Sequence, residues 1–415
     1  MNILFISHRI PYPPNKGDKI RSYNMLCHMV KSHNVYLASH IDDSRDFKYV
    51  DVLRDMVDGI FCDRINRPVR KIMSSFSILR SASISVSYFY SHKVQKWIDS
   101  IIDEKEIDAI FCFSSPSAEY VFRSRHYQTK MKRIRLIMDF IDVDSYKWRQ
   151  YAERTRGAMR FVYRSEAANL ERYERRIAEE FDRLLLVSES EKLLFPGEVP
   201  GSKLGALRNG VDLDYFSPKF RPTLPVTGPM LVFTGAMDYW PNIDGAAWFI
   251  QNVFDRVLAV CPDVSFHVVG SNPVRDLRRL AAGRPEVVVT GYVDDVRNYL
   301  AAADLCVVPL RIARGIQNKV LEAMAMGKAV VCTPEALEGI DAPPGAGCLR
   351  AEAPEAFASA VIDLLCDGPR SRRLGMRGRA FVESRFSWPG NLAPLDSILG
   401  AGAAAPPPGL TMEAM

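Results

Sequence analysis

The segment DLCVVPLRIARGIQNKVLEAMAMGKAVVCTP (304–334) decides the fold class. Its two ends, DLCVVPL (304–310) and AVVCTP (329–334), are short apolar runs, which are typical of parallel strands covered on both faces. Between them a helix is expected to begin near Asn318 and to end at Gly327, and a short loop with Gly315 precedes it. The segment therefore predicts a strand, a crossover helix and a second strand of one parallel sheet.

The same alternation extends over almost the whole chain. Helical patterns such as 244–260 and 355–367 separate the short apolar runs. Besides the two runs above, the predicted strands are 2–7, 34–40, 109–115, 135–141, 183–188, 230–236, 264–270 and 287–293. This order is typical of an α/β fold with doubly wound parallel sheets.

A proline-rich stretch, LDYFSPKFRPTLPVTGP (213–229), is the expected domain boundary. It has four prolines and little helical or strand pattern, so we predict a linker there. The 415 residues then divide into an N-terminal domain, 1–212, and a C-terminal domain that begins at residue 230, in keeping with roughly 150 residues per domain. The end of the chain, 400–415, is rich in small residues and proline and is expected to be disordered.

Composition indicates a globular protein of the cytosol. Hydrophobic residues make up 47% and charged residues 25%, which excludes disordered, collagen-like and disulfide-scaffold proteins. The eight cysteines include no C-x-x-C pair and lie in or beside apolar runs, so we expect reduced core residues. No stretch approaches the ~18 consecutive apolar residues of a membrane span. We expect a soluble, cytoplasmic protein, with contact at the inner face of the cytoplasmic membrane as an alternative.

Basic residues are concentrated between Arg123 and Arg176. This segment has fifteen Lys or Arg and seven Asp or Glu, whereas the whole chain has a net charge of only +5. It suits either a solvated helical face with charge pairs in 164–180, or attraction to an anionic membrane or a lipid-phosphate acceptor. The stretch 67–82 mixes basic and apolar residues, and it suits either a surface helix or a membrane interface. No nucleic-acid binding is expected, because the aromatic residues of the basic segment form no stacking pattern.

Lys319 and Glu322 are the main candidate binding residues. They are three positions apart, so both project from the first turn of the expected helix, at the carboxyl end of a strand where ligands of open sheets bind. Backbone N–H groups at a helix N-terminus favour a phosphate. A lysine there can hold a diphosphate, and a carboxylate can accept hydrogen bonds from a ribose diol. The pair therefore predicts a nucleotide site.

Gly315 followed by NKVLEAMAMGKAVV (318–331) resembles the donor-binding signature of the family 4 retaining glycosyltransferases of the GT-B fold. Further similar stretches are NGVDLDYFSP (209–218), FTGAMDYWPNIDG (233–245), GYVDDVRNYLAAADLCVVPL (291–310) and ESRFSWPGN (383–391). The resemblance covers 1–395 and is strongest over 207–340. With HRIPYPPNKGDKIRSYN (8–24), the chain most resembles the bacterial exopolysaccharide, PEP-CTERM-associated sugar transferases.

This resemblance implies GT-B architecture, with two Rossmann-like, doubly wound domains facing across a cleft. Domain 1–212 would bind the acceptor, domain 230–383 would bind the nucleotide-sugar, and a helix at 384–399 would cross back. Glu322 matches the second glutamate of the family's Glu-x7-Glu motif, which binds the donor ribose. The first glutamate is replaced here by Arg314. The family's usual basic pair is also missing, since GAMDYWPN (235–242) offers Asp238 and Asn242, so Lys319 with Arg311 or Arg314 would supply charge for the diphosphate.

Two stretches of the first half add candidate residues. In PPNKGDKIR (13–21), Gly17 would let the backbone approach a diphosphate closely, as in the family's glycine-bearing loop, although a glycine turn before a helix is common. In DFIDVDS (139–145), Asp142 and Asp144 point the same way if the chain is extended, where the family presents an active-site group; Asp144 or Ser145 could equally cap a helix. His8, His28, His40 and His267 are interpreted as structural or surface groups.

The expected activity is transfer of a sugar from a nucleotide diphospho-sugar to a glycan or lipid-linked acceptor in exopolysaccharide biosynthesis. No cofactor or metal ion is expected. The alternatives are a nucleotide-sugar epimerase of the same fold and an inactive scaffold. The predicted catalytic residues are Asp142, Asp144, Arg314 and Lys319. The predicted donor-binding residues are Gly17, Gly235, Asn242, Gly291, Gly315, Asn318, Lys319 and Glu322.

Overall fold

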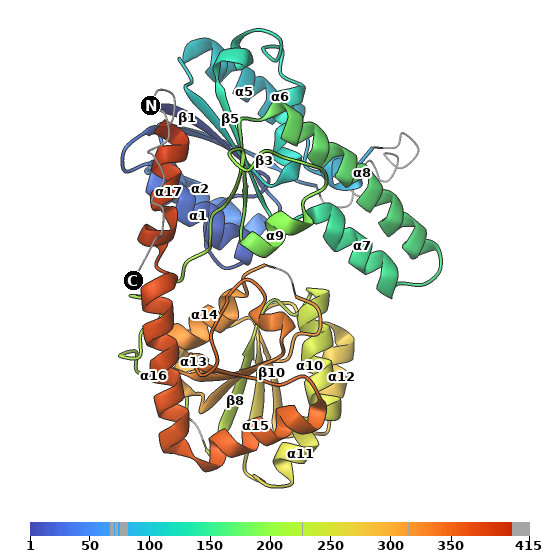
Figure 1. Ribbon diagram of the computed structural model, residues 1–415, viewed down its shortest axis with the longest axis vertical. Coiled ribbons are helices and arrows are strands. Elements are labelled where there is room, and N and C mark those ends of the chain that lie inside the picture. The colour runs from blue at the N-terminus through green and yellow to red at the C-terminus, as the bar shows by residue number, and fades with distance from the viewer. Residues whose placement is uncertain (67–69, 71–73, 75–81, 226, 314, 401–415) are drawn as a thin grey trace, which may run out of the picture.

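The computed structural model describes residues 1–66, 70, 74, 82–225, 227–313 and 315–400. They form two α/β domains, one above the other along the longest axis (Figure 1). Most of 67–82, the predicted catalytic Arg314 and most of the predicted disordered tail lie outside the described residues. Gly400, placed in that tail, instead ends a helix.

The N-terminal domain contains a seven-stranded parallel sheet in the order β3-β2-β1-β4-β5-β6-β7. Its strands are β1 Asn2–Ser7, β2 Asn34–Ile41, β3 Gly59–Arg64, β4 Ala109–Phe113, β5 Arg135–Ile141, β6 Arg183–Leu186 and β7 Leu204–Ala206. Its longer helices are α1 Gly17–Met29, α5 His92–Glu104, α7 Asp144–Arg154 and α8 Ala158–Glu180; shorter ones are α2 Val50–Arg54, α4 Ile84–Tyr88, α6 Glu119–Phe122 and α9 Glu189–Leu194, with 3-10 turns η1 Ser44–Tyr49, η3 Ser115–Ala118 and η4 Lys130–Arg133.

The C-terminal domain contains a six-stranded parallel sheet in the order β10-β9-β8-β11-β12-β13. Its strands are β8 Met230–Thr234, β9 Ser265–Val269, β10 Val287–Gly291, β11 Leu305–Val308, β12 Ala329–Cys332 and β13 Cys348–Arg350. Its helices are α10 Trp240–Asn252, α11 Phe254–Leu258, α12 Arg275–Ala281, α13 Arg297–Ala302, α14 Asn318–Ala325, α15 Pro354–Cys366 and α16 Gly368–Arg385, with the turn η5 Glu335–Leu337. Strand order reverses at β1/β4 and at β8/β11, the positions where open sheets bind ligands.

The central strands follow the sequence pattern closely. β1 and β5 occupy the predicted ranges 2–7 and 135–141, and their interior residues are buried on both faces. The predicted α/β class with two doubly wound parallel sheets is therefore confirmed. The three unpredicted strands β3, β7 and β13 all lie at sheet edges, where strands are short or only half-buried and give a weak apolar signal. The helix predicted over 244–260 is broken at Val253 into α10 and α11.

The segment 213–229 differs from the expected linker. Leu213, Phe216 and Phe220 pack against the core of the C-terminal domain, so this segment is attached to that domain. The chain passes between domains just before it, at 209–211, and again at 386–388. These two passages lie side by side, because the Val211 N–H donates to Phe386 O at 2.7 Å.

The last helix, α17 (Trp388–Gly400), lies on the N-terminal domain (Figure 1). Trp388, Leu392 and Leu395 are buried in the same core cluster as residues of α1 and β1. Residues 384 and 385, predicted to belong to this helix, instead end α16. A single long C-terminal arm thus packs on both domains.

All eight cysteines are free thiols. Four of them are buried, as expected, but Cys366 is exposed at the end of α15, so the prediction of eight core cysteines is wrong for it. No helix within the described ranges combines the length and the apolar composition needed to cross a membrane.

Candidate functional site

The N-terminus of α14 faces the N-terminal domain. β11 ends at Val308, and the loop that follows reaches Gly315, whose φ of +61° favours glycine. Asn318, the first residue of α14, accepts a hydrogen bond at Oδ1 from Asn209 Nδ2 at 3.3 Å across the domain boundary. The free N–H groups of the first helical turn are therefore presented at the boundary, where they can bind an anion.

The ammonium of Lys319 is held by the opening of α10. Lys319 Nζ donates to Asn242 Oδ1 at 2.6 Å, and Asn242 Nδ2 donates to Ala236 O at 2.9 Å. A Cβ added to Gly235 would lie 2.6 Å from Asn242 Nδ2, so only glycine leaves room for this amide. Four predicted donor-site residues, Gly235, Asn242, Asn318 and Lys319, are thereby brought together.

Lys319 and Glu322 are both half-buried and have shifted pKa values. Burial lowers the pKa of Lys319 to about 8, and the nearby charge of Glu322 opposes this shift. Burial likewise raises the pKa of Glu322 to about 7, opposed by Lys319. Each charge is thus only partly compensated by the other, and the site is suited to a ligand that brings negative charge to Lys319 and hydroxyl donors to Glu322.

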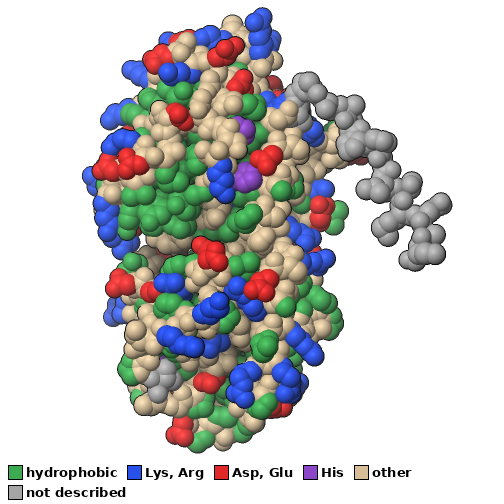
Figure 2. Space-filling model, turned by 90° about the vertical axis from the view of Figure 1, so that its left-hand side faces the viewer, with side chains coloured by type: hydrophobic (Ala, Val, Ile, Leu, Met, Phe, Trp, Pro, Cys, Tyr) green, Lys and Arg blue, Asp and Glu red, His purple; other side chains and the backbone are tan. Residues whose placement is uncertain are grey.

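The N-terminal domain directs a second helix N-terminus at the same place. α1 begins at Gly17, and a Cβ added there would lie 3.9 Å from Asn318 Nδ2. The predicted diphosphate-binding residue Gly17 therefore lies opposite the N-terminus of α14, which follows the loop with Gly315. Seen from the side of α17, the outline of the molecule is drawn in where the two domains meet. Hydrophobic side chains of the N-terminal domain gather just above this level (Figure 2).

A buried network behind Asn209 fixes this junction. Arg21 is fully buried; its Nε donates to Asp139 Oδ2 at 2.9 Å and its Nη1 donates to Asn209 Oδ1 at 2.8 Å. Asn209 then donates to Asn318, so one chain of polar contacts runs from β5 to α14. Sequence reasoning missed Arg21 and Asn209, because their partners lie more than a hundred residues away.

Asp142 approaches the Gly315 loop from the end of β5. A Cβ added to Gly315 would lie 2.5 Å from Asp142 Oδ1, so the carboxylate nearly touches the opposite domain. The preceding Ile141 has φ +72°, a conformation that β-branched residues rarely adopt and that is found mostly at functional sites. Burial raises the pKa of Asp142, although Lys147 nearby lowers it.

Asp144 does not share the role expected for it. The chain is not extended there: Asp144 opens α7, and its carboxylate forms an ion pair with Lys147. Val143 occupies the N-cap position, and neither Asp144 nor Ser145 caps the helix with its side chain. Ser145 instead donates to Glu174 of α8. The structure therefore brings Asp142 but not Asp144 to Gly315.

The remaining predicted residues lie around this centre. Gly291, with φ +75°, ends β10 immediately before the exposed Tyr292. Arg311, expected to supply charge for a diphosphate, is instead paired through two nitrogens with Asp244 of α10. Asp238 is exposed and accepts a hydrogen bond from Asn272 at 3.1 Å.

The position of one histidine near Gly17 was not predicted. His8 follows β1, is buried, and its Nε2 lies 3.3 Å from Asp18 Oδ2 on α1. Burial alone would raise the pKa of Asp18, but His8 and Arg9 hold it well below its usual range. His8 thus lies beside the Gly17 loop, and its proximity to Asp18 could not be seen from an isolated histidine in the sequence.

The arrangement of helix N-termini at strand carboxyl ends can be compared with known proteins. Residues 228–367 match the family described as "Glycosyl transferases group 1". Over 96% or more of its length the chain superposes on solved structures that include a sucrose-phosphate synthase and WaaG, a glycosyltransferase involved in lipopolysaccharide biosynthesis. The fold is GT-B. The GT-B fold observed here, two Rossmann-like parallel-sheet domains, confirms the expected architecture.

Two GT-B structures illustrate the likeness. Sucrose-phosphate synthase from Thermosynechococcus elongatus has a TM-score of 0.69 and 18% identity, covering 97% of this chain and 100% of that one. Anabaena HepE, solved with UDP and glucose, has a TM-score of 0.68 and 14% identity, with the same coverage. At this level of identity the likeness concerns the fold alone.

One curated relative gives a sequence match. The GDP-mannose-dependent monoacylated alpha-(1-6)-phosphatidylinositol monomannoside mannosyltransferase of Corynebacterium glutamicum is 29% identical over 201 residues. The match covers 44% of this chain, and the chain spans about half the length of that relative.

Among the described residues, no group of three or more His, Cys, Asp or Glu side chains is arranged to hold a metal ion.

Proposed function

We propose that the protein is a retaining, metal-independent glycosyltransferase of group 1 that transfers a sugar from a nucleotide diphospho-sugar to a glycan or lipid-linked acceptor. The observation on which this depends is the meeting of two helix N-termini, at Gly17 and Asn318, beside the ammonium of Lys319. The match of 228–367 to group 1 glycosyltransferases supports the assignment of the donor site to the C-terminal domain.

Each donor-site residue has a chemical task in this proposal. Breaking the bond between sugar and diphosphate leaves negative charge on the diphosphate, and Lys319 with the N–H groups of α14 and α1 stabilises it. These fixed positive groups take the place of a metal ion. Glu322, which is half-buried, accepts hydrogen bonds from the ribose hydroxyls. Asn242 positions Lys319 by holding its ammonium at 2.6 Å.

We place the reaction centre beside the contact of Asp142 with the Gly315 loop. In transfer with retention, the acceptor hydroxyl attacks the sugar carbon on the side of the leaving group, and its proton passes to the departing diphosphate oxygen. We propose that Asp142, 2.5 Å from the space that a Gly315 methyl group would occupy, positions the acceptor hydroxyl or the sugar there. We assign no catalytic task to Asp144, because its carboxylate is paired with Lys147.

The first test is a donor screen by thermal shift. GDP-mannose and UDP-glucose are the leading choices, since the curated relative is named for GDP-mannose and HepE was solved with UDP and glucose. A donor at about a hundred times its dissociation constant stabilises the protein by about 2.7 kcal/mol. We expect one donor to raise the melting temperature of the protein, and not that of Lys319→Met. No response to any UDP-, GDP-, ADP- or TDP-sugar would contradict the proposal.

A second test separates transfer from epimerisation. With the donor that binds, a transferase releases nucleoside diphosphate in proportion to the acceptor supplied, whereas an epimerase converts the donor without acceptor. We expect acceptor-dependent release, and place the acceptor in exopolysaccharide biosynthesis. Conversion of the donor into its epimer with no acceptor present would identify an isomerase instead.

A further inference from the structure

α7 and α8 form a helical hairpin that projects from the N-terminal domain on the side opposite α17 (Figure 1). Two buried glutamates of α8, Glu166 and Glu174, anchor it to the rest of the domain. Glu166 accepts hydrogen bonds from Ser83 Oγ at 2.7 Å and from the backbone N–H of Ile84 at 2.7 Å, and Glu174 accepts from the Ser145 N–H at 3.0 Å. The hairpin is therefore a firmly anchored arm with a free end.

The free end, which we call the hairpin tip, comprises residues 154–164. It contains four arginines and no acidic residue. All four are exposed, and none has a side-chain hydrogen bond or ion pair with any residue that the structure describes; they are Arg154, Arg156, Arg160 and Arg164. Two apolar side chains lie among them: Phe161 is 70% exposed and Met159 is 47% exposed.

The surface charge of this region exceeds what the sequence count suggests. Of the seven acidic residues between Arg123 and Arg176, Asp139, Glu166 and Glu174 are buried and satisfied by hydrogen bonds inside the domain. Their charges are turned away from solvent, whereas the arginines of the hairpin tip face it. The exposed side of the hairpin therefore carries more net positive charge than the count of charged residues in its sequence indicates.

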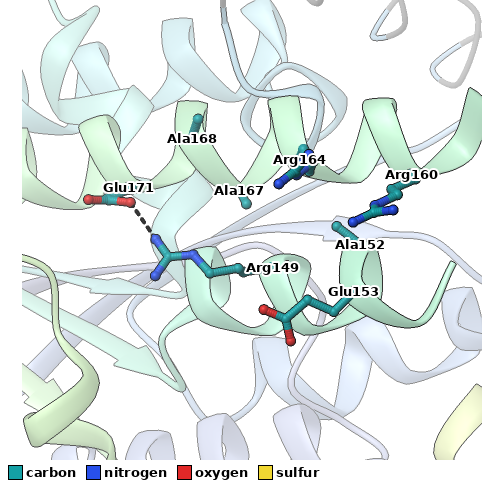
Figure 3. A pocket seen from close by; sticks show the side chains of 8 residues that line it. All are labelled: Arg149, Ala152, Glu153, Arg160, Arg164, Ala167, Ala168 and Glu171. Atoms are coloured by element: carbon teal, nitrogen blue, oxygen red, sulfur yellow. Dashed lines mark hydrogen bonds and ion pairs between the residues drawn. The ribbon is translucent and has the colours of Figure 1, made fainter.

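A pocket lined by charged side chains adjoins the tip. It has a volume of about 260 Å³ between α7 and α8, and its charged lining consists of three arginines, Arg149, Arg160 and Arg164, and two glutamates, Glu153 and Glu171. Figure 3 shows Arg160 and Arg164 on α8 facing α7, while Arg149 is engaged by Glu171 at 2.7 Å. Two guanidinium groups therefore remain available for an anionic group that enters the pocket.

The hairpin also reaches the interdomain gap. Tyr151 of α7 packs against Trp240 at the start of α10, with ring centroids 5.8 Å apart, and against Tyr163 of α8 at 6.3 Å. Trp240 lies two residues from Asn242 of the donor site. A row of aromatic side chains thus leads from Tyr163 in the hairpin tip to Trp240, at the start of the helix that carries Asn242.

We propose that the hairpin tip binds an anionic phospholipid surface, with the side chains of Phe161 and Met159 inserted among the head groups and the arginines bound to lipid phosphates. Exposed aromatic and arginine side chains at the end of a rigid arm match such a surface in both polarity and charge. This inference rests on the proposed function, since it names the surface at which a lipid-linked acceptor is met. It concerns the hairpin, not the predicted interface at 67–82.

The test is sedimentation of the whole protein with vesicles of phosphatidylcholine alone or mixed with phosphatidylglycerol. We expect binding only to the mixed vesicles, weakened by high salt. Each arginine near the surface contributes about fivefold to partitioning, so Arg156→Gln/Arg160→Gln should bind about 25-fold more weakly. Met159→Ser/Phe161→Ser should also bind more weakly, but should keep its salt dependence.

Two control variants test whether vesicle binding depends on the position of the substituted side chains. Arg275→Gln/Arg279→Gln removes two exposed arginines from α12, and Leu193→Ser/Met376→Ser removes two exposed apolar side chains elsewhere; both should bind vesicles like the original protein. Absence of binding to mixed vesicles, or equal losses in hairpin and control variants, overturns the inference. We expect the hairpin variants to keep the donor-induced thermal shift. Failure of lipid binding would therefore leave the proposed function unaffected. Failure of the proposed function would be detected in the donor screen, which is a separate experiment.

Discussion

Replacing Lys319 by methionine should make the protein more stable and less able to bind its donor. The pKa of Lys319 is lowered from 10.5 to about 8 by burial, and a shift of this size corresponds to about 3 kcal/mol against the charged form at pH 7. Loss of the hydrogen bond to Asn242 removes about 1 kcal/mol of that gain. The net stabilisation of Lys319→Met should therefore be about 2 kcal/mol, or roughly 5 °C in melting temperature.

The stability gain should depend on pH with a definite sign. Because the folded-state pKa of Lys319 lies below its unfolded value, the unfolded state binds more protons between about pH 8 and 10.5. The original protein should therefore gain stability relative to Lys319→Met as the pH rises through this window. Denaturant melts at several pH values measure the difference directly.

Lys328 provides the matched control for this experiment. It is also a half-buried lysine with a pKa lowered by burial, but its Nζ donates to Ala301 O at 2.7 Å and to Ala303 O at 2.8 Å, inside the C-terminal domain. Lys328→Met leaves these carbonyls unpaired and should destabilise the protein without changing donor affinity. Lys319→Met should weaken donor binding by about 2 kcal/mol or more, about thirtyfold. Unchanged donor affinity in Lys319→Met, or a stability loss like that of Lys328→Met, would refute the reasoning.

Three further outcomes are expected. Donor affinity should be highest between about pH 7 and 8, because Glu322 is ionised above about 7 and Lys319 is charged below about 8; calorimetric titration of Lys319→Met should lack the alkaline decline. Gly315→Ala should lower turnover at least tenfold by its clash with Asp142, while Gly197→Ala, with φ +90° but open space around it, should not. Arg21→Met should cost about 3–5 kcal/mol in urea unfolding by leaving a buried carboxylate unpaired, and adding Asp139→Asn should restore part of it.

The sequence predicted the parts of the fold that depend on continuous apolar runs. β1, β5 and the start of α14 lie where the pattern indicated, since a strand buried on both faces must be apolar at nearly every position. β13 was missed because a three-residue edge strand with one buried position has no such pattern. The break at Val253 was missed because the helical period continues on both sides of it.

The residues of the candidate site could likewise be predicted from the sequence only in part. Lys319 and Glu322 could be paired from their spacing alone, because one helical turn fixes their direction. The contact of Asp142 with the Gly315 loop depends on how two domains meet and on the φ of +72° at Ile141, and neither is encoded in local periodicity. The ion pair of Arg311 could not be predicted for a similar reason: its partner, Asp244, lies on a different helix, 67 residues away.

The two passages between the domains lie together at one edge of the molecule, beside Gly210. A Cβ added to Gly210 would lie 2.7 Å from the Trp388 backbone nitrogen, so the connections are pressed against each other and have little room to slide. Because both connections lie at this edge, we expect the domains to open by rotation about it. We expect the opposite edge, where Tyr151 meets Tyr239 at 3.4 Å between hydroxyls, to move farthest in such a rotation. That edge also adjoins the α7–α8 arm, so the proposed contact of the hairpin tip with phospholipid would place it beside the membrane surface.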